Sequence, residues 1–346
     1  MACKRKSIFT IGGNSLILHT LGHPIFNPVR NFQNMRISAS VSSLHARDLA
    51  PSVALLDKAG VNFFHLDSIE SREIFAFERR LRGFTKTPFD LHLITSDPIK
   101  YWDDIRQSSI SEITIQLESL HSPLFVPEDL KPKVGIAVLA SRPAEFFKPF
   151  EKSATTLLLM TTTPGHSGGK FQQEQFANIM RYRILYPHLP VTVDGGVIPT
   201  VASVLTMMGI PQIVSGSYLF KGNSVQETVT NLRTQDLTDW RMDEVLLPEP
   251  ELLKRFSLRL PEMLPYLNSN AEITEVPVKN DWLDALSAKT VADNPSPFPV
   301  ILVDETIQLN AFQAKINTLE TPPHMALTLN SAGELTGICC LAAYKG

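Results

Sequence analysis

Four side chains that could bind a metal ion occur in short apolar runs of the sequence. His65 and Asp67 end the run VNFFHLD, His92 lies in FDLHLI, and Asp194 follows the valines of PVTVDGG. Two imidazoles and two carboxylates suit one divalent ion such as Zn²⁺, Fe²⁺, Mn²⁺ or Co²⁺. A single strand histidine is more often a structural residue, and a single strand-end aspartate is more often a cap. Four such groups in similar settings favour a metal site or an acid–base site.

Three glycine-rich stretches follow later apolar runs and are suited to hold a phosphate. TTPGHSGGKF carries Gly165, Gly168 and Gly169, and it is followed along the chain by DGG at 194–196 and SGS at 215–217. Glycines let backbone N–H groups approach an anion closely, although such turns also occur without a ligand. Their occurrence in successive loops predicts a phosphate site.

The elements that must position these residues follow one repeating pattern, an apolar run and then an amphipathic stretch. The apolar runs lie at 36–41, 61–67, 89–94, 112–118, 133–139, 154–160, 190–196 and 211–217. Alternation of strand and helix predicts a parallel sheet, and eight units predict a closed (β/α)8 TIM barrel. A doubly wound open sheet is the alternative, but no glycine-rich dinucleotide loop follows the first strand. In a barrel, the chemical groups and glycine loops meet at the carboxyl ends of the strands.

The pattern divides the chain into three parts. Residues 1–35 form an N-terminal extension that resembles a hairpin, and residues 36–235 form the barrel. Residues 236–346 lose the alternation and are rich in proline, so we expect a small C-terminal α+β extension of unknown role. Within it the pattern predicts a helix near 249–258, a strand near 298–304 and a final hairpin that turns at NSAG.

Composition excludes several classes of protein. A net charge of −3 gives no general attraction to nucleic acid or to anionic membranes. No apolar run reaches the ~18–20 residues that cross a bilayer. The three cysteines include the adjacent pair Cys339 and Cys340, which fits a reducing, cytoplasmic setting. The lack of acidic residues before Asp48 leaves a transit peptide as the alternative.

Several motifs occur in the order found in a known family. ISASVSSL, HLD, DLHLI, LLLMTTTPGHSGGKF, VTVDGG and IVSGS follow one another between residues 36 and 233. Together they resemble the ribulose-phosphate 3-epimerase family, whose members are (β/α)8 barrels of the ribulose-phosphate-binding type. The resemblance implies an isomerase that inverts carbon 3 of a ketose phosphate through a cis-enediolate.

The resemblance also implies roles for individual residues. His65, Asp67, His92 and Asp194 would bind the one metal ion, and Asp67 and Asp194 would double as the acid–base pair. Ser40 would match the active-site serine of the family. Met160 and the phosphate-contacting residues would complete the site; the latter are Gly165, Gly168, Gly195, Gly196, Gly216 and Ser217.

Departures from the family pattern leave the substrate open. Ile69 and Ile94 stand where the family usually has methionine, His166 stands in the phosphate loop, and Gln116 stands where the family often has histidine. The default substrate is D-ribulose 5-phosphate, converted to D-xylulose 5-phosphate in the pentose phosphate pathway, and related hexulose phosphates remain open. The alternative is a non-catalytic sugar-phosphate sensor or assembly subunit. Self-association as a homo-oligomer is also left open.

Overall fold

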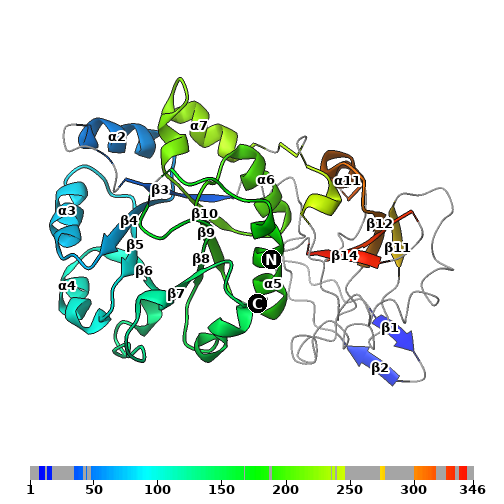
Figure 1. Cartoon of the computed structure of the whole chain (residues 1–346), viewed down its shortest axis with the longest axis horizontal. Helices are drawn as coiled ribbons and strands as arrows, with labels where there is room; N and C mark the ends of the chain where they lie inside the picture. The colour runs from blue at the N-terminus through cyan, green and yellow to red at the C-terminus, as the bar shows by residue number, and fades with distance from the viewer. Residues whose placement is uncertain are drawn as a thin grey trace.

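Eight parallel strands close into a barrel in the computed structural model of the chain (Figure 1). The first barrel strand pairs with the last, and every other strand pairs with its neighbours in sequence. The predicted (β/α)8 barrel is therefore confirmed, and the open-sheet alternative is excluded. The barrel strands are β3 (Arg36–Ser40), β4 (Phe63–Ile69), β5 (Phe89–Ile94), β6 (Ile110–Gln116), β7 (Val134–Leu139), β8 (Leu157–Met160), β9 (Val191–Asp194) and β10 (Gln212–Ser215).

The structure describes most of the barrel and parts of both extensions. The described residues are 8–11, 14–17, 35–41, 44, 48–166, 168–186, 189–234, 236–237, 240–245, 273–276, 300–316, 325–331 and 335–340. The predicted helix near 249–258 lies outside these residues.

Helices cover the outside of the barrel because each presents an apolar stripe to it. In α2, Leu49, Val53 and Leu56 are buried at helical spacing, and the helix ends at Gly60 with a φ of 77°. The α-helices are α2 (Leu49–Ala59), α3 (Glu73–Arg82), α4 (Trp102–Gln107), α5 (Glu174–Leu185), α6 (Pro199–Met207), α7 (Val225–Leu232) and α11 (Leu309–Ile316). The 3₁₀ helices are η1 (Pro98–Tyr101), η2 (Leu117–Ser119), η3 (Lys131–Lys133), η4 (Ala144–Phe150), η5 (Ser217–Phe220) and η6 (Met242–Glu244).

Arg233, just after α7, ties the end of the barrel to its beginning. Its guanidinium donates to the backbone oxygens of Met35 and Gly60 at 3.2 and 2.8 Å, and to Asn62 Oδ1 at 2.9 Å. The same Asn62 oxygen accepts from the backbone N–H of Ile37 at 2.9 Å. These bonds lie at the amino ends of β3 and β4, so they fix the closure at the end of the barrel opposite the predicted site.

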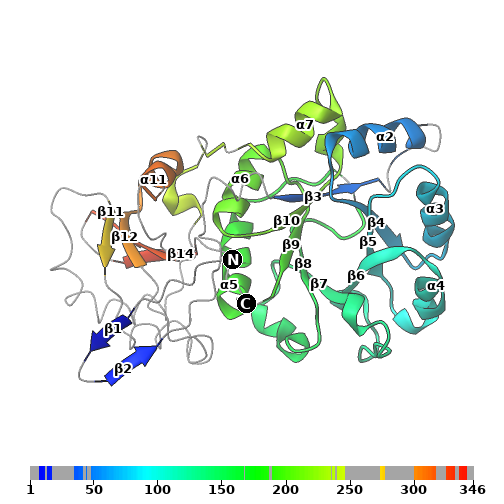
Figure 2. The same ribbon diagram turned by 180° about the vertical axis from the view of Figure 1, so that it is seen from behind.

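The C-terminal extension contains a sheet beside the barrel. Its strand order is β11 (Ile273–Val276), β12 (Val300–Asp304), β13 (Met325–Leu329) and β14 (Leu335–Cys340), and it lies next to α5 and α6 (Figures 1 and 2). β13 and β14 pair antiparallel, as the predicted final hairpin requires. The N-terminal strands β1 (Ile8–Ile11) and β2 (Asn14–Ile17) pair antiparallel in a separate two-stranded sheet.

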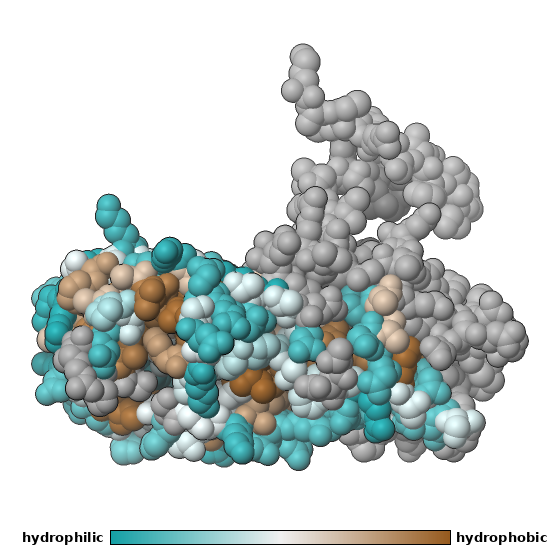
Figure 3. Space-filling view, turned by 90° about the horizontal axis from the view of Figure 1, so that it is seen from above, coloured by the Kyte–Doolittle hydropathy of each residue, from teal (hydrophilic) through white to brown (hydrophobic). Residues whose placement is uncertain are grey.

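The barrel and part of the extension share one buried core. Met242 and Val245, which follow the barrel, and Leu309 and Phe312 of α11 belong to the same cluster as the barrel helices. On the face seen in Figure 3, hydrophobic patches are separated by hydrophilic residues. Among the described residues, no helix is both long enough and apolar enough to cross a membrane.

Candidate active site

The four predicted metal ligands come together inside the mouth of the barrel. Strand register brings them close, because Asp67 of β4 pairs with His92 of β5, and Asp194 ends β9. One nitrogen or oxygen atom from each of His65, Asp67, His92 and Asp194 lies within 4.8 Å of the others. The imidazoles are 1% and 0% exposed and the carboxylates 18% and 17%, so the carboxylates face the opening and the imidazoles lie beneath them.

Hydrogen bonding fixes which nitrogen of His65 faces the site. Its Nδ1 lies 3.1 Å from Oδ2 of Asp90, and a carboxylate can only accept, so Nδ1 carries the hydrogen. Asp90 is itself held by Ser38, whose hydroxyl donates to Oδ1 at 2.7 Å. In the neutral ring, the lone pair is therefore on Nε2, which is buried and has no hydrogen-bond partner. This nitrogen points at Asp67 Oδ1, 3.3 Å away, and at Asp194 Oδ2, 3.8 Å away.

A second chain of hydrogen bonds orients His92. Its Nε2 lies 2.7 Å from Oε1 of Gln116, whose amide nitrogen donates to Glu118. The amide oxygen can only accept, so Nε2 of His92 carries the hydrogen and Nδ1 is left as an acceptor. Nδ1 lies 3.2 Å from Asp67 Oδ1.

The four residues fit a divalent metal ion. Two ring nitrogens with lone pairs face carboxylate oxygens, and such acceptors repel one another unless a cation or an added proton lies between them. Outer partners that fix the ring orientation, as Asp90 and Gln116 do here, are the usual surroundings of metal-binding histidines. The unpaired nitrogen of His65 and the mixed nitrogen–oxygen donor set therefore match a metal site. The donor set does not distinguish among Zn²⁺, Fe²⁺, Mn²⁺ and Co²⁺.

Within this cluster, the pKa values of Asp67 and Asp194 shift in opposite directions. Burial alone would lower the pKa of His65, but Asp90 and Asp67 outweigh it and raise that pKa well above its ordinary value. Burial would raise the pKa of Asp67, but His65 and His92 hold it well below the usual range. Burial raises the pKa of Asp194 to about 6, against the opposing charge of His65. Two carboxyl groups with separated pKa values are typical of an acid–base pair.

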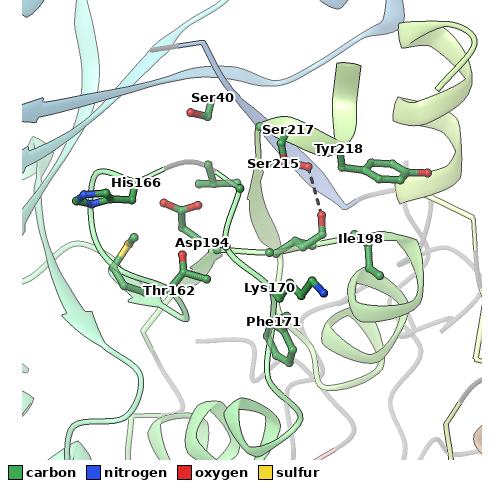
Figure 4. Close-up of a pocket in the computed structure, with 18 of the residues that line it drawn as sticks. Ser40, Thr162, His166, Lys170, Phe171, Asp194, Ile198, Ser215, Ser217 and Tyr218 are labelled. Atoms are coloured by element: carbon green, nitrogen blue, oxygen red, sulfur yellow. Dashed lines mark hydrogen bonds between the residues drawn. The ribbon is translucent and has the colours of Figure 1, made fainter. Parts of the chain in front are cut away.

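A pocket of about 760 Å³ opens above the cluster (Figure 4). Asp67 and Asp194 reach it, together with Ser40 at the end of β3 and Met160 at the end of β8. All the predicted phosphate-contacting residues also line it: Gly165, Gly168, Gly195, Gly196, Gly216 and Ser217. The two carboxylates of the cluster and the glycine-rich loops thus line one cavity.

The loops around the pocket are packed against one another. Gly196, with a φ of 64°, approaches the next loop so closely that a Cβ there would lie 2.2 Å from the backbone nitrogen of Phe171. Only glycine fits this contact and this backbone conformation without strain. The β9–α6 loop and the β8–α5 loop therefore fix each other's position.

Comparison with known proteins agrees with this geometry. The family model described as the ribulose-phosphate 3 epimerase family matches residues 36–220, which is just over half of the chain. This chain belongs to that family. The cytoplasmic isoform of ribulose-phosphate 3-epimerase from Oryza sativa subsp. japonica is 26% identical over 57% of this chain and 92% of its own length. The ribulose-phosphate 3-epimerase of Synechocystis sp. is 24% identical over 64% of this chain and 98% of its own.

Among solved structures, thiamine phosphate pyrophosphorylase from Pyrococcus furiosus is 17% identical with a TM-score of 0.40, covering 59% of this chain and 96% of its own.

Two departures from the family pattern, Ile69 and His166, line the pocket, whereas Gln116 is buried against His92. Ile69 lines the pocket and is half exposed, and a Cβ on Gly165 would lie 2.4 Å from its Cδ1 and 3.1 Å from Ile94 Cδ1. His166 also lines the pocket, with Nδ1 donating to the backbone oxygen of Pro164 at 3.0 Å.

Several residues of the site were not predicted from the sequence, among them Asp90, Lys221 and Trp240. Asp90 orients His65, and its signal was an acidic residue inside the apolar run FDLHLI. Lys221 and Trp240 line the pocket but lie beyond the part of the chain that matches the family. Only the three-dimensional structure brings Trp240 to the pocket, because no local pattern connects it with the barrel.

Proposed function

We propose that this protein epimerises carbon 3 of a ketose phosphate through a cis-enediolate, with D-ribulose 5-phosphate and D-xylulose 5-phosphate as the default pair. The observation that carries this proposal is the convergence of two inward-facing imidazoles and two carboxylates beneath a pocket lined by glycine-rich loops. Related hexulose phosphates are the other candidate substrates. We also propose a cytoplasmic setting in the pentose phosphate pathway, and the state of self-association is left to experiment.

His65, Asp67, His92 and Asp194 would hold one divalent ion. When bound, such an ion polarises a carbonyl and stabilises the negative charge that develops on its oxygen. Asp90 and Gln116 would keep the two imidazoles in the tautomers that present a lone pair to the ion. The protein supplies this arrangement in advance, so little reorganisation is needed when the ligand enters.

Asp67 and Asp194 would carry out the proton transfers. One carboxylate removes the proton from carbon 3 on one face of the substrate, and the other carboxylic acid returns a proton to the opposite face. In the metal-free site the pKa of Asp67 lies well below its usual range and that of Asp194 is raised to about 6, so their surroundings already distinguish the two carboxyl groups. In the reverse direction, the two residues exchange roles.

The rest of the pocket would position the substrate between these groups. Ser40 would bind a hydroxyl of the sugar, and the sulfur-containing side chain of Met160 would pack beside the planar intermediate. The backbone N–H groups of the glycine loops would hold the phosphate. Holding both ends of the ligand places carbon 3 between the two carboxylates, and such positioning is a large part of catalytic power.

The test is the metal content of the purified protein together with turnover of D-ribulose 5-phosphate before and after chelation. One metal per chain and turnover that is lost on chelation and restored by metal would support the enzyme and its substrate together. Metal without turnover of this pentulose phosphate would redirect the assay to hexulose phosphates. Neither metal nor turnover, even after metal addition, would reject the epimerase and favour a sugar-phosphate sensor or assembly subunit.

A further inference from the structure

We propose that the C-terminal extension contributes to ligand binding by forming part of the pocket wall. Within it, Trp240 would be a positioning residue for the proposed phosphate loop between β8 and α5. This inference rests on the proposed function, because it concerns the binding of a phosphorylated ligand in the same cavity. It assigns a role to a part of the chain that the family model does not match.

The first observation is where the pocket lining ends in the sequence. The family match stops at residue 220, yet Lys221 and Trp240 also line the cavity. The rice relative aligns over 92% of its own length with only 57% of this chain. Trp240 therefore lies outside the stretch that the family model matches.

The second observation is an aromatic contact that links Trp240 to the phosphate loop. The indole meets the ring of Phe176 in α5 edge to face, with centroids 5.2 Å apart. Phe176 in turn lies 4.7 Å from the ring of Phe171, which lines the pocket at the end of the loop. Edge-to-face and tilted aromatic pairs at these distances attract one another, so the three rings form one packed row.

The extension holds Trp240 in place from its other side. The backbone oxygen of Trp240 accepts from the N–H of Leu309 at 3.0 Å. Two residues further on, Met242 N–H donates to the backbone oxygen of Ile307 at 3.0 Å. Met242 and Leu309 are both buried, so residues 240–245 are anchored in the common core.

Any movement of Phe171 would also displace the loop that packs against it. Its backbone nitrogen is the atom against which Gly196 packs, and Lys170 beside it extends toward Ile198 across the pocket (Figure 4). A side chain that braces Phe171 therefore also sets the position of the β9–α6 loop. Removing the brace should loosen the phosphate cradle while leaving the metal cluster, which lies on β4, β5 and β9, unchanged.

The chemistry of the contact tells which substitution should be tolerated. Trp240 Nε1 is buried and has no hydrogen-bond partner, so the indole contributes packing rather than a hydrogen bond. Phenylalanine keeps most of that packing, whereas alanine removes it. Trp102 of α4 supplies a control, because its Nε1 is also buried and unpartnered but it does not line the pocket; its side chain is more deeply buried than the partly buried Trp240.

The experiment compares Trp240→Ala, Trp240→Phe and Trp102→Ala in the full-length, metal-loaded protein. We expect Trp240→Ala to raise KM for D-ribulose 5-phosphate about tenfold with kcat within about twofold, a split that indicates lost substrate binding. Calorimetric binding of inorganic phosphate should weaken by a similar factor. Trp240→Phe should restore both values to within about threefold, and Trp102→Ala should lower only thermal stability.

Several results would overturn the proposal. Folded Trp240→Ala protein with unchanged KM and phosphate affinity would remove Trp240 from the pocket's function, as would an equal effect of Trp102→Ala. If Trp240→Ala does not fold, unchanged values for a Trp240→Leu variant would count in the same way. If the wild-type protein has no turnover but binds inorganic phosphate, the proposed function fails, and the phosphate measurements still decide the role of Trp240.

Discussion

At the scale of single residues, the hydrogen-bond partners of His65 and His92 determine which ring nitrogen presents a lone pair to the site. His65 would be ambiguous in isolation, because either ring nitrogen could carry the hydrogen. Asp90, which can only accept, removes that ambiguity and leaves Nε2 as the group that faces the two carboxylates. The geometry of the candidate metal site therefore depends on Asp90 and Gln116 as much as on the four clustered residues.

Replacing Asp90 by alanine should weaken metal binding by about 10–100-fold, the usual effect of losing an outer partner of a histidine ligand. The substitution leaves Nδ1 of His65 without its acceptor, so the ring can rotate or change tautomer. Competition with a chromophoric chelator measures the affinity. Ser38→Ala, which removes only the hydroxyl that supports Asp90, should have a smaller effect. Equal metal affinity in Asp90→Ala and wild type would show that the ring is fixed by packing instead.

Metal uptake should weaken as the pH falls through about 6. Below that pH Asp194, whose pKa is raised by burial to about 6, becomes protonated, and the incoming cation must displace that proton. Each displaced proton changes the apparent affinity by about tenfold per pH unit. Asp67 stays ionised throughout and adds nothing to the slope, whereas His65, whose pKa is raised well above its ordinary value, must also release a proton and adds its own pH dependence. Titration of metal-free protein between about pH 5 and 8 tests this, and Asp194→Asn should bind more weakly but with a shallower pH dependence. A flat profile for the wild type would contradict the assignment.

At the scale of elements, the sequence predicts the positions of the barrel strands, because the burial of each strand is visible as an apolar run in its own residues. All eight barrel strands overlap the apolar runs, because strands buried on both faces are continuously hydrophobic. Their ends were less predictable: the run 112–118 corresponds to Ile110–Gln116, and β4 continues two residues past Asp67 to Ile69. Apolar periodicity does not mark where a strand stops pairing, since that depends on the neighbouring strand.

Some residues of the candidate site could likewise be predicted from the sequence, and others could not. The four clustered ligands and the glycine loops could be predicted because each sits at or near a strand end, and barrel topology brings strand ends together. Trp240 could not be predicted, since its place depends on how residues 240–245 pair with residues 305–309 and pack on α5. Contacts between elements distant in sequence leave no local pattern.

The packing of the β8–α5 and β9–α6 loops against each other gives a prediction at this scale. Gly196→Ala would place a Cβ 2.2 Å from the Phe171 backbone nitrogen and should destabilise the fold by about 1–3 kcal/mol, as overpacking does. The loops must separate, so phosphate binding should weaken as well. Gly168→Ala is the matched control, because its φ of 86° imposes backbone strain but no atom lies within 4 Å of the new Cβ. Urea unfolding and phosphate calorimetry compare the two variants, and an equal loss in both would attribute the effect to φ alone.

At the scale of the whole molecule, the barrel and the extension are joined by a shared core. Residues 240–245 are bonded to the segment between β12 and α11, and their apolar side chains are buried with those of the barrel helices. Arg233 closes the amino end of the barrel before this joint begins. The chain thus completes its barrel by residue 233 and then covers one side of it, over α5 and α6 (Figure 2).

Removing everything after residue 235 should therefore leave a barrel that is folded but markedly less stable. Met242 and Val245 are fully buried, and each such side chain contributes ~1.5–3 kcal/mol, so a loss of about 3–6 kcal/mol is expected from these two alone. The truncation also uncovers Phe176, which should promote aggregation, because an exposed apolar face seeks another partner. Thermal unfolding and light scattering of the full and truncated chains measure both effects. Equal unfolding temperatures and a monodisperse truncated protein would mean that the extension is a separable module, with residue 235 as a true domain boundary.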